Sequence, residues 1–223
     1  LRSPLLTQSG YGEHGRFILR ALKTREDLFD IHVHATNWGK TSWIWEDTAE
    51  RRSIDECLQK TMHYAHESSG KPEFDMSLQV TIPNEWELIA PLNIGVTAGI
   101  ETTKVSPVWL ERGNYMDRII TVSNHSKNTY ASSSYEGSNK LTNEPMHLKL
   151  ETEIDVVGYP VKSLDAADTE LNLTTDFNFF AVQMLAPRKN TEQLVRAFVE
   201  QFKDNADVGL ILKSNIMKNC TLD

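Results

Sequence analysis

The chain has 223 residues, of which 39% are hydrophobic and 9% aromatic, and its 23 basic and 31 acidic residues give a net charge of −8. This composition is typical of globular proteins, and the acidic balance argues against a nucleic-acid partner and against a general surface for anionic membranes. No run approaches the ~20 apolar residues of a transmembrane helix, although peripheral membrane contact stays open. Cys57 and Cys220 lie far apart without metal-ligand spacing, so we expect free thiols, no signal peptide and a cytoplasmic location.

The first residues predict a strand, a turn and a helix. Residues 1–6 are typical of a strand end, residues 7–15 (TQSGYGEHG) are rich in glycine, and apolar residues recur at helical spacing over 17–22. Glycines let the backbone approach a ligand, and a helix N-terminus favours anions. Gly10 and Gly12 are therefore candidate phosphate-binding residues. A tight turn without a ligand is an equal alternative, because SGYG is not the full dinucleotide fingerprint.

The next segment predicts a strand, a helix and a second strand. Residues 29–35 alternate like a strand, with His32 and His34 on one face. A metal pair needs further ligands, and none is apparent, so a half-exposed strand face is favoured. Helical spacing covers residues 54–67, and strict alternation over 74–82 predicts another strand.

Two loops in this region carry side chains suited to sugars. The loop at residues 37–47 contains three tryptophans, Trp38, Trp43 and Trp45. Their rings either stack on sugars or pack the loop down, and packing is the commoner use. Glu85 and Glu87 follow the second strand, where they are either acceptors for substrate hydroxyls or ordinary exposed carboxylates.

Residues 92–126 contain the most informative pattern. Residues 92–96 (LNIGV) are typical of a parallel strand covered on both faces. Residues 97–103 (TAGIETT) then place small side chains and Glu101 beyond the carboxyl end of that strand, where ligands bind in open α/β sheets. A ligand site is therefore expected there.

The same stretch continues with a helix, a strand and a second helix. Ser106 and Pro107 are suited to open a short helix, and residues 117–122 predict the next strand. Ser123 and Asn124 cap the following helix, so its free N–H groups are expected at the same edge of the sheet.

The last third predicts a linker and a second α/β unit. Residues 136–148 are turn-rich and predict a loop, residues 154–161 predict a strand, and residues 162–175 have no clear periodicity. A buried strand at 177–184 and a strand at 208–213 flank an amphipathic helix.

A basic turn lies between the first strand of this unit and its helix. Asn190 is expected to cap the helix. Arg188 and Lys189 either neutralise a diphosphate or form a solvated basic turn.

Several of these motifs resemble glycosyltransferase family 4. The matching motifs are GIETTKVSPVW, NYMDRIITVS and NHSKNTY, together with AVQMLAPRKNTEQLVRAF in the second unit. The resemblance implies the GT-B architecture. It implies a Rossmann-like parallel-sheet domain at residues 1–161, a linker at 162–175 and a truncated second Rossmann-like domain at 176–223.

The resemblance also implies a reaction and roles for residues. The expected reaction moves a hexose from a nucleotide-diphosphate sugar to a glycan or other hydroxyl acceptor, with retention of configuration and without a metal or other cofactor. Glu101 is the expected catalytic residue. The donor phosphates are assigned to Lys189, Arg188, Gly10 and Gly12, and the acceptor to Glu85, Ser123 and Asn124.

The chain also departs from the family pattern. Met184 stands where the family often has an arginine, and no histidine clearly matches the family's catalytic-type histidine. The family's later Glu-rich donor motif is not present, so an incomplete, inactive chain with exposed apolar surface is expected. The alternatives are a non-catalytic carbohydrate- or nucleotide-binding module and another nucleotide-sugar enzyme, such as an epimerase.

Overall fold

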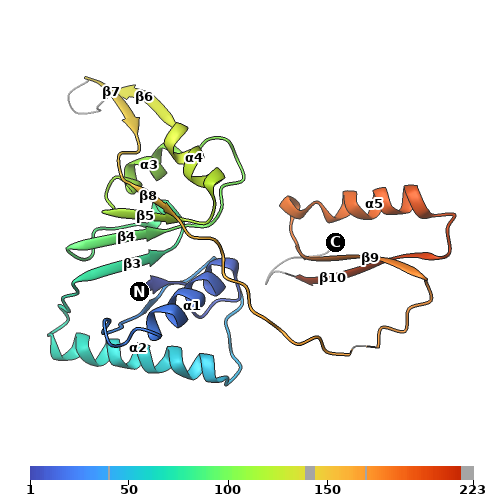
Figure 1. Cartoon of the computed structure of the whole chain (residues 1–223), viewed down its shortest axis with the longest axis horizontal. Coiled ribbons are helices and arrows are strands. Elements are labelled where there is room, and N and C mark those ends of the chain that lie inside the picture. Colours follow the sequence, from blue (N-terminus) through green and yellow to red (C-terminus); the bar gives the residue numbers. More distant parts are fainter. Residues whose placement is uncertain (40, 139–143, 169, 217–223) are drawn as a thin grey trace. The chain divides into compact units, whose positions relative to one another are not determined.

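A computed structural model describes residues 1–39, 41–138, 144–168 and 170–216. The chain divides into two compact units (Figure 1). The first unit comprises residues 1–39 and 43–161, and the second comprises residues 40–42 and 162–223. Within the described residues, no helix has both the length and the apolar character needed to cross a membrane.

The first unit contains a parallel sheet of six strands in the order β2-β1-β3-β4-β5-β8. These strands are β1 (Arg2–Ser3), β2 (His34–Ala35), β3 (Met76–Val80), β4 (Leu92–Val96), β5 (Arg118–Thr121) and β8 (Ile154–Val156). The α/β class and the Rossmann-like parallel sheet of this unit are thus confirmed. The strand order changes direction between β1 and β3, which makes this the switch point of the sheet.

The helices of the first unit begin at residues suited to cap them. They are α1 (Gly10–Lys23), α2 (Ala49–Glu67), η1 (Pro83–Glu85), α3 (Pro107–Gly113) and α4 (Asn124–Ser132). The side chains of Ser9, Thr48 and Ser123 each accept a hydrogen bond from a backbone N–H of the first turn of α1, α2 and α4, respectively. Helices α1 and α2 lie at the β1–β2 end of the sheet, and α3 and α4 lie at the β5–β8 end (Figure 1).

A buried tryptophan organises the core near β4. Trp86 has no exposed surface and clusters with Leu110, Ile119 and Tyr130. A Cβ atom added to Gly95 of β4 would lie 2.7 Å from the Trp86 ring. The glycine therefore makes room for the ring against the strand.

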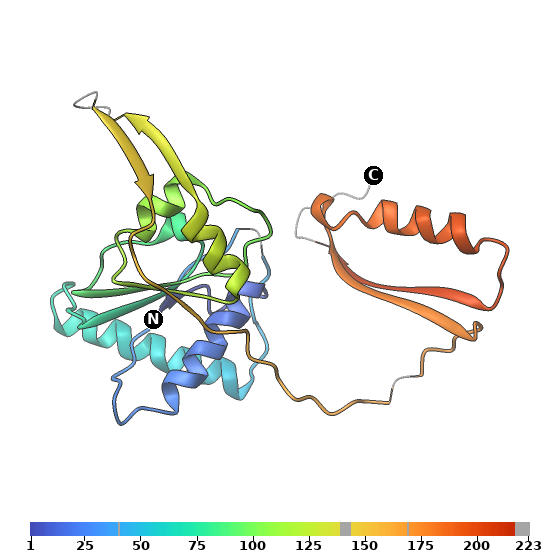
Figure 2. The same ribbon diagram turned by 45° about the horizontal axis from the view of Figure 1, so that its top comes forward.

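An antiparallel hairpin projects from the first unit (Figure 2). It consists of β6 (Ser134–Ser138) and β7 (Pro145–Lys149). The sequence predicted a loop at residues 136–148, and this prediction is wrong where the two strands lie. Residues 139–143 of that range fall outside the described part. Tyr135 packs against the core together with Leu148. These tertiary contacts override the turn-rich composition.

Four other predictions differ from the structure. The strand predicted at residues 29–35 is reduced to β2, and the one at 154–161 ends at Val156. The glycine-rich segment is largely helical, because α1 begins at Gly10. Asn190 makes no side-chain cap bond and has a left-handed backbone with φ of 51°.

The second unit is one βαβ element. It consists of β9 (Phe177–Leu185), η2 (Pro187–Lys189), α5 (Thr191–Phe202) and β10 (Val208–Ile216), and the two strands pair in parallel. Phe179 contacts the rings of Phe198 and Phe202 at centroid distances of 6.1 and 5.3 Å. Phe180 and Val182 are 64% and 63% exposed, so β9 is not the buried strand predicted, and the apolar exposure expected of this unit is present.

Candidate functional site

The topology of the sheet places the candidate site at its carboxyl edge. We use this name for residues 4–12, 81–85, 97–101 and 122–126, which follow β1, β3, β4 and β5. In open α/β sheets, ligands bind outside the carboxyl ends of the strands near the switch point. The predicted site residues of the first unit all lie at this edge: Gly10, Gly12, Glu85, Glu101, Ser123 and Asn124.

Hydrogen bonds join the separate segments of the carboxyl edge. The Tyr11 hydroxyl lies 3.0 Å from Thr97 Oγ1 and accepts a hydrogen bond of 3.1 Å from the Ala98 N–H. The Ile100 N–H donates to Ser126 Oγ at 2.9 Å. The loop after β4 is thereby tied to the first turns of both α1 and α4, whose N-terminal N–H groups favour anions.

The two predicted glycines have different surroundings. Gly12 is buried, its N–H donates to Ser9 Oγ at 3.0 Å, and an added Cβ would lie 2.2 Å from the Thr7 carbonyl oxygen. Its lack of a side chain lets α1 pack on the preceding turn. Gly10 is exposed, and an added Cβ would have no atom within 4 Å. Gly10 therefore has the open space that a ligand requires.

Buried hydroxyl and imidazole groups lie next to these segments. Tyr130 is fully buried and His14 is 7% exposed. Within the described residues, His14 Nδ1 has no hydrogen-bond partner, and Tyr130 Oη has none of normal geometry, although the Thr97 side chain interacts with it and opposes the rise in its pKa. Buried polar groups almost always have partners, so each of these atoms is open to a water or a ligand.

Burial keeps this cluster uncharged near neutral pH. It raises the pKa of the Tyr130 hydroxyl, and it raises the pKa of Tyr11 against the opposing hydrogen bonds to Thr97 and Ala98. Burial also lowers the pKa of His14. The cluster therefore offers neutral hydrogen-bonding groups, which suit sugar hydroxyls.

Two aromatic contacts extend the cluster. The rings of Tyr159 and His14 lie 4.9 Å apart, and those of Tyr11 and Trp38 lie 4.5 Å apart. Burial raises the pKa of Tyr159 against an opposing backbone hydrogen bond from Gly99. The segment after β8 therefore reaches the loop that follows β4.

The predicted carboxylates and the residues at the start of α4 differ in exposure and in hydrogen bonding. Glu85 is half-buried, and burial raises the pKa of its carboxyl group while the nearby Arg2 charge opposes that shift. Glu101 is exposed in the loop after β4. Ser123 Oγ accepts the Ser126 N–H at 3.1 Å, and Asn124 is exposed at the start of α4. Of these four residues, Glu101 and Asn124 are therefore the exposed ones.

The predicted phosphate-binding residues of the second unit lie at the carboxyl end of β9. Arg188 and Lys189 belong to the η2 turn, which directly precedes α5. The Lys189 side chain is exposed, and its backbone N–H donates to the Ala186 carbonyl at 2.9 Å. A cation next to a helix N-terminus is a suitable place for a phosphate.

Sequence reasoning missed the aromatic part of the carboxyl edge. Tyr11 stands between the two glycines of the turn, so its position gave a usable signal. Tyr130 follows Ser126 by one helical turn, which predicts a shared face but not burial at the sheet edge. His14 and Tyr159 come together only through the tertiary fold, and no local pattern marks them.

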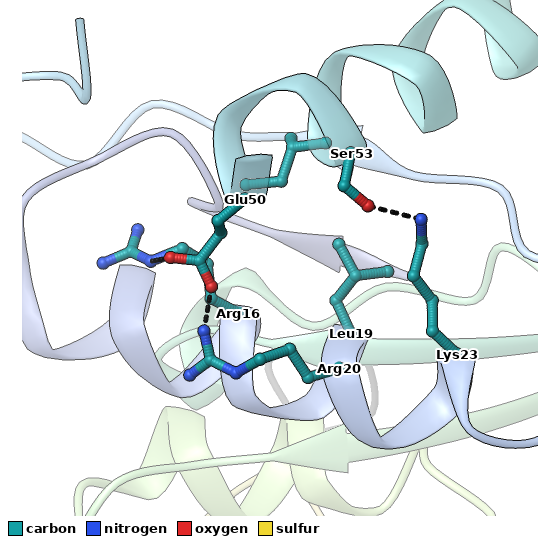
Figure 3. Close-up of a pocket in the computed structure, with 7 residues that line it drawn as sticks. Arg16, Leu19, Arg20, Lys23, Glu50 and Ser53 are labelled. Carbon is teal, nitrogen blue, oxygen red and sulfur yellow. Dashed lines mark hydrogen bonds and ion pairs between the residues drawn. The ribbon is translucent and has the colours of Figure 1, made fainter. Parts of the chain in front are cut away.

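A cavity of about 130 Å³ lies between α1 and α2 (Figure 3). Its basic residues already have partners: Arg16 and Arg20 contact Glu50, and Lys23 donates to Ser53. The charged side chains that line this cavity therefore form an ionic contact between the two helices.

A second cavity, of about 630 Å³, is lined by residues that include Lys23, Asp30, Cys57 and Lys60. Cys57 is a buried free cysteine, and Cys220 lies outside the described residues.

The histidine pair considered as a metal site has an acidic neighbour: His32 Nε2 lies 3.3 Å from Asp30 Oδ2. In the described part of the chain, no three His, Cys, Asp or Glu side chains gather as metal ligands.

Two tyrosine variants test the hydrogen bonds of the carboxyl edge. We expect Tyr11→Phe to lower the free energy of unfolding by about 1 kcal/mol, because it removes bonds to Thr97 and Ala98. Tyr130→Phe is expected to change stability less than Tyr11→Phe does, because the buried Tyr130 hydroxyl has only a weak contact with Thr97 to lose. Urea denaturation followed by circular dichroism measures both. A larger loss in Tyr130→Phe than in Tyr11→Phe would contradict this arrangement.

The burial of His14 predicts a dependence of stability on pH. Burial holds its folded-state pKa below the ordinary histidine value of 6.5, so the unfolded chain takes up a proton more readily. Stability is therefore present above pH 6.5 and declines as the pH falls towards the folded-state pKa. In urea denaturation between pH 7.5 and 5, His14→Gln is expected to lose less stability than the wild type.

If the free energy of unfolding changes equally with pH in the wild type and in His14→Gln, the predicted effect of burying His14 is contradicted.

Comparisons with protein-family models, with curated proteins and with solved structures give no match for this chain. The resemblance to glycosyltransferase family 4 therefore depends on the motifs in the sequence. The geometry of the carboxyl edge and of the η2 turn is independent of that resemblance.

Proposed function

We propose that the chain belongs to a cytoplasmic glycosyltransferase that moves a hexose from a nucleotide-diphosphate sugar to a hydroxyl acceptor. The first unit is assigned to the acceptor and the second to the donor, as in a GT-B enzyme. The transfer is proposed to retain configuration and to need no metal.

The observation that carries this proposal is the hydrogen-bonded junction at the carboxyl edge. Tyr11 and Ser126 hold the loop after β4 against the first turns of α1 and α4. Positive helix ends, neutral tyrosine hydroxyls and the exposed Glu101 carboxylate are thereby gathered at one edge. This combination suits a polyhydroxylated ligand that carries phosphate.

Donor binding is assigned to the η2 turn. The Lys189 ammonium and the N-terminus of α5 offer positive charge at the carboxyl end of β9. As the bond between the sugar C1 and the diphosphate oxygen breaks, negative charge grows on the diphosphate, and fixed positive groups stabilise it. Arg188 in the same turn is assigned the same role.

Acceptor activation is assigned to Glu101. Its carboxylate is proposed to orient the acceptor hydroxyl and to accept its proton as the new glycosidic bond forms. Glu85, Ser123 and Asn124 are assigned contacts with the acceptor. Gly10 and Gly12 are assigned to the donor phosphates: Gly10 has open space beside it, and the Gly12 backbone supports the turn.

Calorimetric titration with UDP-, GDP- and ADP-glucose tests donor binding. We expect at least one of them to bind, and Lys189→Ala to weaken that binding about tenfold or more, because a charge-assisted contact to phosphate is lost. Lys203→Ala is the control, since Lys203 is an exposed lysine at the far end of α5.

The products distinguish the alternative functions. A donor that binds and comes back unchanged with every acceptor indicates a non-catalytic binding module, and an altered donor sugar indicates an epimerase. Failure of all three nucleotides to bind would contradict the donor assignment.

A further inference from the structure

We propose that Trp43 and Trp45 form a stacking surface for a neutral, hexose-based glycan. This names the acceptor class of the proposed transfer, and only its role as acceptor rests on that function. The surface is called the tryptophan segment and comprises residues 43–45.

The tryptophan segment is fixed to the carboxyl edge. Trp43 forms an antiparallel β-bridge with Thr7, and the Ile44 N–H donates to the Leu6 carbonyl at 2.7 Å. The Arg51 guanidinium donates to the Ile44 carbonyl from α2. Backbone bonds on both sides of Ile44 therefore hold the segment beside the turn that leads into α1.

The two tryptophans remain exposed although their backbone is fixed. Trp43 is 50% exposed and Trp45 is 78% exposed, while Ile44 between them is half-buried. Trp43 and Trp45 flank Ile44, so two exposed indoles are near neighbours along the chain beside the turn that leads into α1. Trp38 in the same loop instead packs on Tyr11 at 4.5 Å. Trp38 therefore packs the loop against Tyr11, and this contact does not involve the other two indoles.

The polar neighbours of the segment indicate the partner. The carboxylates of Glu46 and Asp47 are exposed directly after Trp45. A hexose ring offers apolar C–H faces to an indole and hydroxyl groups to a carboxylate, so this surface matches both. Arg52 is paired with Asp47 at 2.8 Å, so these two charges offset each other, and the exposed Glu46 carboxylate repels the anionic headgroups of a bilayer. A neutral glycan therefore fits the surface better than a membrane does.

Titration of the full chain with maltopentaose, cellopentaose and mannopentaose, followed by saturation-transfer NMR and calorimetry, tests the proposal. We expect at least one of these to bind saturably. The double variant Trp43→Ala/Trp45→Ala is expected to weaken binding about tenfold, and Trp45→Phe, which keeps an aromatic face, to weaken it about threefold or less. Met62→Ala is the control, because Met62 is 71% exposed on α2.

Several outcomes would overturn the proposal. They are no saturable binding of any of the three oligosaccharides, equal binding by the double variant, and tryptophan-dependent sedimentation with phosphatidylcholine–phosphatidylglycerol vesicles in place of oligosaccharide binding. Circular dichroism of the double variant checks that it folds. If it does not, the single variant Trp45→Ala, at the 78% exposed position, provides the test: it is expected to weaken binding about threefold or more, and unchanged binding would overturn the proposal.

The nucleotide-sugar titrations provide a separate readout on the same proteins. We expect the double variant to keep its donor binding. Oligosaccharide binding without any donor binding would contradict the proposed transfer and leave the stacking surface supported. Donor binding without oligosaccharide binding would contradict the stacking surface and leave the proposed transfer supported.

Discussion

The buried guanidinium of Arg16 fixes the turn on which the carboxyl edge depends. It donates to the carbonyls of Leu5 and Thr7 at 2.8 and 2.9 Å and pairs with Glu13 at 2.8 Å. A buried charge is costly unless it is paired and hydrogen-bonded, so these bonds favour the conformation of the turn that directs both carbonyls at the guanidinium. That conformation places Tyr11 where its hydroxyl meets the loop after β4. The same turn supplies the backbone that holds the tryptophan segment.

The two units present the same arrangement with different chemistry. In the first unit, the strand–turn–helix junction carries the neutral hydroxyls of Tyr11 and Tyr130, whose pKa values burial raises further above neutral pH. In the second unit, the corresponding junction carries the exposed Lys189. A neutral, hydroxyl-rich edge suits an acceptor, and a basic turn suits a diphosphate. The proposed division of roles follows from this difference in charge.

The sequence predicted those features that depend on local patterns. The apolar run of β4 and the Ser123 cap of α4 follow from periodicity and capping, and the structure contains both. The β6–β7 hairpin was missed because its stability comes from packing of Tyr135 on the core. His14 was missed as part of the site because its neighbour Tyr159 is distant in sequence. Local patterns thus located the edge of the sheet, while contacts distant in sequence determined its chemistry.

Hydrogen–deuterium exchange of the full chain, with and without UDP-, GDP- and ADP-glucose, tests most directly whether the carboxyl edge binds the ligand. Bound ligand slows the exchange of the backbone amides it covers. The account predicts slower exchange at residues 186–191 of the second unit and at residues 9–14 of the carboxyl edge, where Gly10 and Gly12 are assigned to the donor phosphates. Protection confined to the cavity lined by Asp30 and Cys57, or no protection by any of the three, would contradict it.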